Sequence, residues 1–525
     1  MASSTTSALS DLSAALVTAP VPLSDWLIIL PVALSIGTGA VLMMLRHTMR
    51  LHAPIAIAAL FLLVLLDAAL LWKVATQGPF TMVMGRWLPP FGIAFTADLT
   101  GTLLSLAAAI VALAGAIHAS ADIDASGRRY GFYPFLMLLM AGVTGAFLTG
   151  DLFNLYVWFE VLLISSFGLI VLGSTREQID GALKYAILNL IGTTLFLITV
   201  GYLYAIFGTL NMADIALKAN GLRGTAPLMT LASLFALAFA MKAAAFPVNF
   251  WLPASYHTPR IVVSALFGGL LTKVGIYALL RVMVMLFPVE REELSIVIAI
   301  SAALTMVLGA MGALAQNDIR RMLGYIVISG IGYMMAGIAI GTPSGVAGAI
   351  FYALHSMVLM TALYLAAGHA ARLGGSFTLS SLGSLYRQAP WFSGLVLALF
   401  FAGSGLPPFS GFWPKVVLVK SAIDIGAWWL AGALLLSGFI ATIAFGRVFL
   451  LCFWRPAAAS TGQPPSPVVS PPAAPSFVPL VGLTVLVVFF GLFPESLLNL
   501  SQQAAAGLGN PEAYIRSVFS EGVRP

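Results

Sequence analysis

The stretch NLYVWFEVLLISSFGLIVLG, from Asn154 to Gly173, has the length of a helix that crosses a lipid bilayer, and most of its residues are apolar. Its apolar residues do not alternate with polar ones, which favours a transmembrane helix over a strand of a β-barrel. Glu160 is the one charged residue inside it. A carboxyl group inside such a helix needs a functional or structural reason.

Similar apolar blocks recur from about residue 25 to about residue 497, and 60% of the chain is hydrophobic while only 8% is charged. The sequence therefore predicts an all-α polytopic membrane protein with about fourteen spans. The block from roughly Trp26 to Leu45 follows a segment without basic residues, so we expect a retained span and not a cleaved signal. Arginines concentrate in alternate loops, which predicts that these loops are cytoplasmic and that both chain ends lie outside.

The single cysteine, Cys452, excludes an internal disulfide, a cysteine-ligated iron–sulfur cluster and a CxxCH haem site. We expect no cofactor and no metal centre. The net charge of +6 arises from basic residues scattered through short loops, without the continuous basic stripe of a nucleic-acid-binding surface. We expect a lipid bilayer around the chain and no nucleic-acid partner.

Two apolar blocks are interrupted by prolines beside a Phe-Trp pair. One reads MKAAAFPVNFWLPASYHTP, from Met241 to Pro259, and the other reads GSGLPPFSGFWPKVV, from Gly403 to Val417. Proline removes a helix hydrogen bond, so both helices should be broken, and paired breaks indicate inverted repeats around a central ion site. The predicted segments are N-terminal helices (1–132), a first repeat (133–285), a second repeat (294–453), a Pro/Ala-rich cytoplasmic linker (454–476), and a last span with a C-terminal tail (477–525).

Five ionisable residues lie deep in the predicted spans: Glu160, Lys242, Lys273, His355 and Lys415. Four of them are about 12 to 18 Å from the nearest span end, at ~1.5 Å per helical residue in a core of about 30 Å. The fifth, Lys242, directly precedes the first break. Burial of such groups is costly, so one acid and four bases at this depth predict a proton relay. We expect Lys242 to be the partner of Glu160.

Each of these residues also has a structural interpretation. Glu160 and Lys242 would form a fixed ion pair that orients two helices, His355 would be a hydrogen-bonded core histidine, and Lys273 or Lys415 would extend to the membrane surface. Other polar residues give weaker signals. We interpret them as a buried acid without an obvious partner (Asp67), helix caps (Asp98, Asp151), interfacial histidines (His118, His369), and either a proton-uptake site or a plain loop histidine (His257).

The combined motifs resemble one known family. The residues are YVWFE with Glu160, AMKAAAFPVNFWLPASYHTP with Lys242, GGLLTKVGIYALLR with Lys273, YALHSMVLMTALYLAAGH with His355, and GLPPFSGFWPK with Lys415. They resemble the antiporter-like subunits shared by respiratory complex I and Mrp-type cation/proton antiporters. Within this family the stretch DLFNLYVWFEVLLISSFGLIVLG is most similar to the D-type subunits of Mrp antiporters.

The resemblance implies fourteen helices, two inverted five-helix repeats with broken helices 7 and 12, and a water-filled line of charged residues. It implies a proton-translocating, non-enzymatic subunit of a Na+/H+ antiporter in a bacterial inner membrane, with Na+, K+ or Li+ as the cation. Its expected partners are subunits of the A, B, C, E, F and G types. The alternatives are a proton-pumping subunit of a complex I type oxidoreductase or related hydrogenase, and a membrane scaffold without transport.

The expected mechanism centres on Lys242. Desolvation favours its neutral amine, whereas a nearby ionised Glu160 favours its ammonium form. We expect Lys242 to hold a proton while Glu160 is close, and to pass it toward Lys273, His355 and Lys415 when the two separate. A moving partner subunit must drive that separation, because a fixed pair cannot couple two fluxes.

Overall fold

The computed structural model describes residues 16–17, 21–456 and 474–519. Its N-terminal part contains a β-hairpin whose two strands pair antiparallel, with Phe80 opposite Ala97 and Val83 opposite Ala94. The hairpin separates the second and third long helices. The elements here are η1 (Leu23–Ile28), α2 (Leu30–Met44), η2 (Met49–Leu51), α3 (His52–Gln77), β1 (Phe80–Val83), η3 (Met84–Arg86), β2 (Ala94–Ala97), α4 (Leu99–Asp122) and α5 (Ala125–Arg129).

The next group of helices contains the first predicted break. One helix stops at Ala243 because Ala244 adopts left-handed backbone angles (φ 62°) and Pro247 follows without an N–H group. The elements are α6 (Phe132–Leu148), α7 (Leu152–Ile170), α8 (Arg176–Phe207), α9 (Met212–Leu222), α10 (Leu228–Ala243), α11 (Trp251–Ser255), α12 (Ile261–Leu279) and the π-helical turn η4 (Leu280–Leu286). The break between α10 and α11 confirms the proline-based prediction.

The third group contains the second break. Gly405 has a φ of 85° and precedes Pro407 and Pro408, so the helix ends at Ser404 and restarts at Phe412. The elements are α13 (Pro288–Glu293), α14 (Ser295–Ala315), α15 (Ile319–Ile340), α16 (Pro343–Gly374), α17 (Leu385–Gln388), α18 (Pro390–Ser404), α19 (Phe412–Asp424), α20 (Trp428–Phe449) and the π-helical turn η5 (Leu450–Trp454). Both groups thus end in a π-helical turn. The repeat boundaries at 133–285 and 294–453 stay a prediction.

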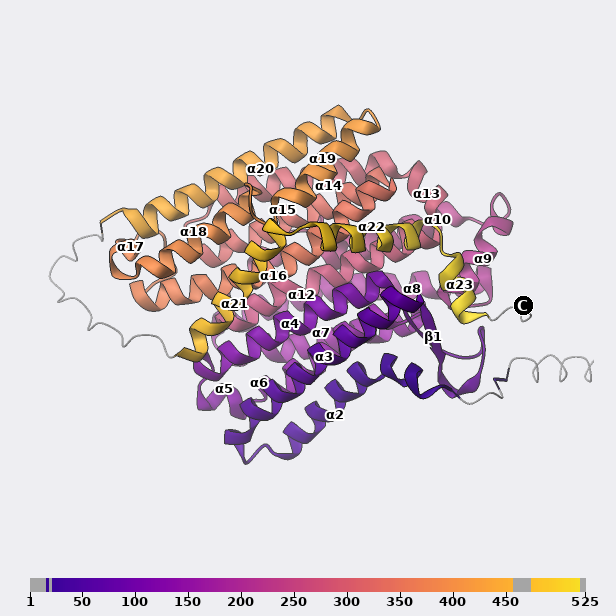
Figure 1. The fold of residues 1–525 in the computed structure, drawn as a ribbon, viewed down its shortest axis with the longest axis horizontal. Helices are drawn as coiled ribbons and strands as arrows, with labels where there is room; N and C mark the ends of the chain where they lie inside the picture. The colour runs from indigo at the N-terminus through magenta and orange to yellow at the C-terminus, as the bar shows by residue number, and fades with distance from the viewer. Residues whose placement is uncertain (1–15, 18–20, 457–473, 520–525) are drawn as a thin grey trace, which may run out of the picture.

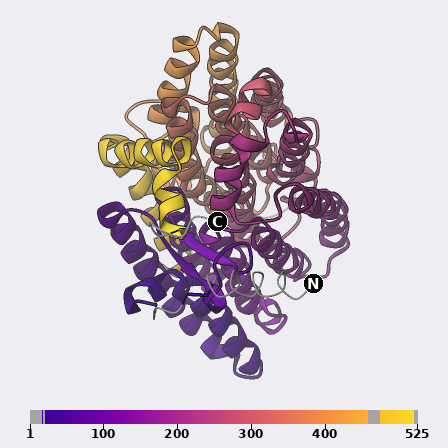
Figure 2. The ribbon, with the colours of Figure 1, turned by 90° about the vertical axis from the view of Figure 1, so that its right-hand side faces the viewer.

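The C-terminal residues form α21 (Ala474–Leu492), α22 (Glu495–Gly509) and α23 (Glu512–Val518). The axes of α21 and α22 differ by 80°, and Pro494 lies at the bend. The sequence predicts one span and a tail here, and the structure shows that the tail is itself helical. Figure 2 shows these helices in yellow along one flank, between the N-terminal helices in indigo and the last helices of the third group in orange. There α22 packs against α4 and α16.

In the described part of the chain, nine helices are long and apolar enough to cross a membrane, and the bent pair α21–α22 is a tenth candidate. Four shorter apolar helices, α2, α6, α10 and α18, accompany them. The count of fourteen spans stays a prediction. The helix α12 is buried along its whole length and α16 from Gly345 to Ala370, so they form the centre of the molecule.

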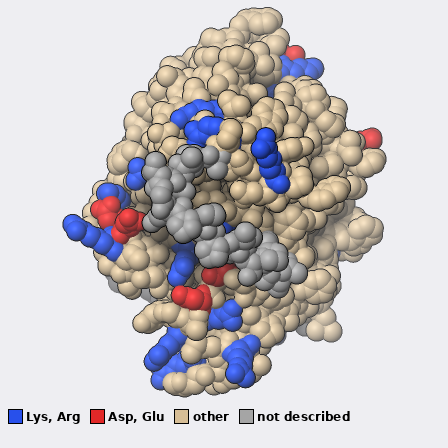
Figure 3. Space-filling model, turned by 90° about the vertical axis from the view of Figure 1, so that its left-hand side faces the viewer, with Lys and Arg blue, Asp and Glu red and all other residues tan. Residues whose placement is uncertain are grey.

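The two ends of the helical bundle differ in charge. Figure 1 places α5 and α17 at one end, and β1, α9, α13 and α23 at the other. On the face at the α5 end, basic side chains are widespread and acidic ones are few (Figure 3). This distribution agrees with a cytoplasmic α5 end. Most of the predicted cytoplasmic linker, residues 454–476, lies outside the described residues.

Candidate functional site

The five predicted residues lie on helices that pack in sequence from one side of the molecule to the other. Lys242 is on α10, Lys273 on α12, His355 on α16 and Lys415 on α19, and each of these helices packs against the next. Glu160 is on α7, which packs against α8, and α8 packs against α10. Lys242, Lys273 and His355 are 5%, 1% and 5% exposed, whereas Glu160 and Lys415 are half-buried. The structure thus arranges these residues as a row, which we call the charged row.

Lys242 lies in the last turn of α10, directly before the break. Its Nζ donates hydrogen bonds to the carbonyl oxygen of Asn189, at 3.1 Å, and to the hydroxyl of Thr193, both on α8. The ring of Phe159 is 5.7 Å from Nζ. The ammonium group is therefore held by uncharged groups of α8 and by an aromatic face.

Glu160 forms no ion pair in the part of the chain that the structure describes. Its carboxylate is nevertheless near enough for its charge to act on Lys242 through space. The expected pair is thus present as two neighbouring charges and not as a contact pair.

Lys273 lies in the middle of α12, and its Nζ donates a hydrogen bond to the carbonyl oxygen of Gly268 at 2.6 Å. No acidic side chain within the described ranges pairs with it. Gly275, two residues later, allows α12 to approach the end of α10, since an added Cβ would lie 2.8 Å from the backbone nitrogen of Ala243. The backbones that carry Lys242 and Lys273 are therefore in direct contact.

His355 contacts the second break. Its Nδ1 is 2.8 Å from the hydroxyl oxygen of Ser410, between α18 and α19. An added Cβ at Gly411 would lie 2.9 Å from Nε2 of His355 and would clash with the carbonyl of Ala402, so only glycine fits there. The charges of Lys273 and of Lys415 both act on His355. His355 therefore occupies an intermediate place in the charged row.

Two tyrosines connect His355 with Lys415. The ring of Tyr352 meets His355 edge-on at 5.8 Å and stacks on Tyr333 at 4.9 Å. The Nζ of Lys415 lies 5.0 Å from the centre of the Tyr333 ring. Aromatic rings exclude water on their faces yet attract cations, so they favour a protonated lysine beside them.

Lys415 is hydrogen-bonded to the C-terminal end of α18, the first half of the second broken helix. Its Nζ donates to the carbonyl oxygens of Gly403 and Ser404 at 3.1 and 2.8 Å, which end α18 and have no intrahelical partner. It also lines an open cavity of about 460 Å³. Lys242 lies at the equivalent, carbonyl end of α10. Each break thus places a lysine where a helix dipole favours a cation.

His257 lies between α11 and α12, outside the spanning segments, and lines an open cavity of about 780 Å³ with acidic and basic neighbours. Its Nδ1 is 2.8 Å from the carbonyl oxygen of Pro253, and its Nε2 is 3.0 Å from Nη2 of Arg321. The carbonyl only accepts and the guanidinium only donates, which selects the neutral Nδ1–H tautomer. Burial, and next the charge of Arg321, lower the pKa of His257.

We expect Arg321→Gln to raise the pKa of His257, because the variant removes a cation that opposes imidazole protonation. If protons exchange with the cytoplasm through His257, the pH of half-maximal transport then moves upward. The measurement is a pH profile of cation-driven proton flux in membrane vesicles. The double variant Arg321→Gln/His257→Gln is the control and should show no such shift. An equal shift in the double variant would exclude His257 as the titrating group.

With this geometry established, comparison with known proteins identifies the family. Residues 149–441 match the family described as NADH:quinone oxidoreductase/Mrp antiporter, TM. The chain belongs to this family. Glu160, Lys242, Lys273, His355 and Lys415 all fall inside the matched region.

Individual members of this family match almost the whole chain. A protein of Alkalihalophilus pseudofirmus, named as the D-type subunit of a Na(+)/H(+) antiporter, is 38% identical over 495 residues, which cover 94% of this chain and 99% of that protein. A Bacillus subtilis protein of the same name is 35% identical, with the same coverage. A chain in the solved Mrp complex from Dietzia sp. DQ12-45-1b has a TM-score of 0.87 and 28% identity, and the match covers 95% of this chain and 100% of that chain.

Several residues of the site carry no sequence signal. Asn189 and Thr193 hold Lys242 from a helix about 50 residues away, and Ser410 meets His355 across 55 residues. Tyr333 and Tyr352 resemble ordinary aromatic residues of apolar helices. The two predicted caps are confirmed, since Asp98 accepts from the backbone N–H of Gly101 and Asp151 from that of Asn154.

Asp67 also has a partner that its sequence context does not reveal. It accepts a hydrogen bond from Ser105 at 3.1 Å, which joins α3 to α4. His118 is within 3.2 Å of Arg372, which also pairs with Asp122, and His369 packs on Phe392. The contacts of His118 and His369 join helices near the α5 end, outside the charged row.

Proposed function

We propose that this chain is a D-type subunit of a multisubunit Na+/H+ antiporter in a bacterial cell membrane, and that it carries protons along the charged row. The observation that carries the proposal is the set of buried bases, Lys242, Lys273 and His355, on consecutive packed helices without contact ion pairs among the described residues. A structural role would pair such charges, because an unpaired buried cation is costly. The relatives named as D-type subunits of Na(+)/H(+) antiporters favour the antiporter over a respiratory proton pump.

In the charged row, protons pass between basic side chains that differ in their exposure to solvent. Lys242 exchanges its hydrogen bonds to Asn189 and Thr193 for closer contact with Glu160 when the first break moves. The α10–α12 backbone contact at Gly275 transmits this motion to Lys273. His355, Ser410 and the two tyrosines then connect Lys273 with Lys415. Waters between these groups conduct the proton, and a partner subunit handles Na+ and moves Glu160 or Lys242.

The proposal assigns one half of the exchange to this chain. The complete complex, with subunits of the A, B, C, E, F and G types, should catalyse Na+-dependent proton flux in proteoliposomes. The isolated chain should show little such flux, since the proposal assigns Na+ handling to a partner subunit. The assay follows a pH-sensitive dye after Na+ addition. Robust exchange by the isolated chain would refute the division of labour, and a complete complex without exchange would refute the antiporter assignment.

A further inference from the structure

Arg281 is a second buried charged residue on α12–η4. It lies closer than Lys273 to the β1 end of the molecule. Lys273, Tyr277 and Arg281 follow one another at four-residue spacing, so they share one face of the helix. The distance from Lys273 to Arg281 along the axis is about 12 Å at ~1.5 Å per residue. Arg281 is 1% exposed and belongs to the π-helical turn η4. It stands between the charged row and the outer face.

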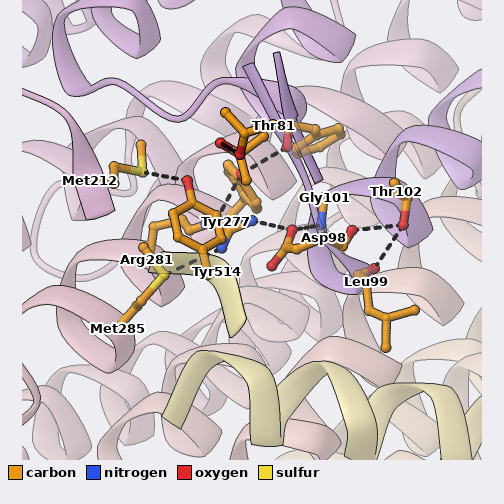
Figure 4. Close-up of polar contacts among 12 residues, drawn as sticks. Thr81, Asp98, Leu99, Gly101, Thr102, Met212, Tyr277, Arg281, Met285 and Tyr514 are labelled. Carbon is orange, nitrogen blue, oxygen red and sulfur yellow. Dashed lines mark hydrogen bonds and ion pairs between the residues drawn. The ribbon is translucent and has the colours of Figure 1, made fainter. Parts of the chain in front are cut away.

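The surroundings of Arg281 fix its guanidinium group on several sides. It forms an ion pair with Asp98, its Nε donates to the hydroxyl of Tyr277 at 2.9 Å, and its Nη1 is 3.5 Å from the sulfur of Met285. The rings of Tyr277 and Tyr514 lie 5.0 and 5.3 Å from the guanidinium carbon. Figure 4 shows these side chains converging from α12, η4, the start of α4 and α23.

The tyrosine between Lys273 and Arg281 cannot pass a proton in this arrangement. Its hydroxyl donates to the carbonyl oxygen of Phe147 at 2.8 Å and accepts from Arg281. The hydroxyl proton of Tyr277 is therefore hydrogen-bonded to a carbonyl oxygen, which can accept a hydrogen bond but cannot donate a proton. An arginine stays protonated in proteins, so Arg281 cannot accept a proton either.

Because Asp98 balances its charge, the guanidinium of Arg281 blocks an incoming hydronium ion chiefly by offering it donors and no acceptor, at a place comparable to the arginine of proton-excluding water channels. We propose that Arg281 closes the path from Lys273 toward the β1 end of the molecule to protons, so that a proton on Lys273 continues to His355 and does not leak to the outer face. The inference rests on the proposed function. At the other end of the row, Lys415 lines an open cavity whose described lining holds one further cation, Lys420, which is exposed and pairs with Asp424 at the surface.

The barrier and a simple structural clamp predict different results for two variants. Arg281→Gln and Asp98→Asn both break the ion pair, but only the first removes the cation. The barrier predicts that the complete complex with Arg281→Gln shows a passive proton leak at least about fivefold above wild type, whereas Asp98→Asn stays as tight as wild type. A clamp predicts the same leak, or the same loss of assembly, from both variants.

The experiment imposes a pH gradient across proteoliposomes that hold the complete complex, without Na+, and follows its decay with a pH-sensitive dye. The double variant Asp98→Asn/Arg281→Gln leaves no unpaired charge and should leak like Arg281→Gln. It replaces the single variant in the assay if Arg281→Gln does not assemble. Adding Lys273→Met to either variant should remove the leak. An assembled Arg281→Gln or double variant as tight as wild type would overturn the proposal, as would a leak of equal size in Asp98→Asn.

The same vesicles separate this inference from the proposed function. Wild-type vesicles that exchange Na+ for protons, together with a tight Arg281→Gln variant, would refute the barrier and leave the proposed function intact. Wild-type vesicles without any exchange would refute the proposed function itself.

Discussion

Lys273→Met should abolish transport while the complex stays assembled and at least as heat-stable as wild type. The methionine side chain is similar in length and apolar, and Lys273 donates a hydrogen bond to Gly268 but forms no ion pair among the described residues. Its removal leaves no orphaned charge behind and eliminates a buried cation that itself costs stability. A group that transfers protons typically contributes about 10² to 10⁴ in rate, so we expect Na+-driven proton flux to fall at least about a hundredfold.

The test of Lys273 needs two readouts and a matched lysine. Complex recovery and melting temperature report structure, and proton flux in vesicles reports transport. Lys184→Met is the control, because Lys184 is exposed and forms a surface pair with Asp180 that contributes little to stability. A Lys273→Met complex with more than half of the wild-type flux would remove Lys273 from the relay. A complex that fails to assemble would assign it a structural role.

Glu160→Gln should also stop transport in an assembled complex. Glutamine has nearly the same shape but no charge, so it cannot favour the ammonium form of Lys242. Lys242 keeps its hydrogen bonds to Asn189 and Thr193 in this variant, since neither involves Glu160. We expect proton flux to fall at least about a hundredfold. Glu160→Asp should keep partial flux, because its charge survives at a greater distance and acts more weakly.

A fixed ion pair between Glu160 and Lys242 predicts a different pattern. Breaking one half of such a pair costs roughly 3 to 5 kcal/mol, so either single variant would fail to assemble. The double variant Glu160→Gln/Lys242→Ala would then recover assembly. Measuring complex recovery together with flux distinguishes the two cases, and a fully active Glu160→Gln complex would contradict both.

The charged row could be predicted from sequence because its signals are local. A charge within a 20-residue apolar stretch is conspicuous wherever it occurs, as for Glu160 and Lys273. Proline and glycine are equally local signals, so Pro247 and Pro408 indicated both breaks. The caps at Asp98 and Asp151 follow from residue type and position at a helix start.

The contacts across the row could not be predicted, because they join residues that are distant in the chain. Arg281 and Asp98 are 183 positions apart, and both resemble residues near span ends. The sequence predicted Glu160 as the partner of Lys242, yet the hydrogen bonds of Lys242 go to Asn189 and Thr193, since α10 packs against α8. The bend at Pro494 did carry a local signal, in the dipeptide of Pro494 and Glu495 at a helix start.

In the proposed mechanism, basic side chains of the row release and take up protons during Na+ exchange. The most direct measurement is simultaneous Na+ and proton flux in proteoliposomes that hold the complete complex with Lys242→Arg. Arginine keeps the positive charge of residue 242 but does not release its proton. We expect an assembled complex in which both fluxes fall to the level of protein-free liposomes. Wild-type exchange by this variant would contradict it.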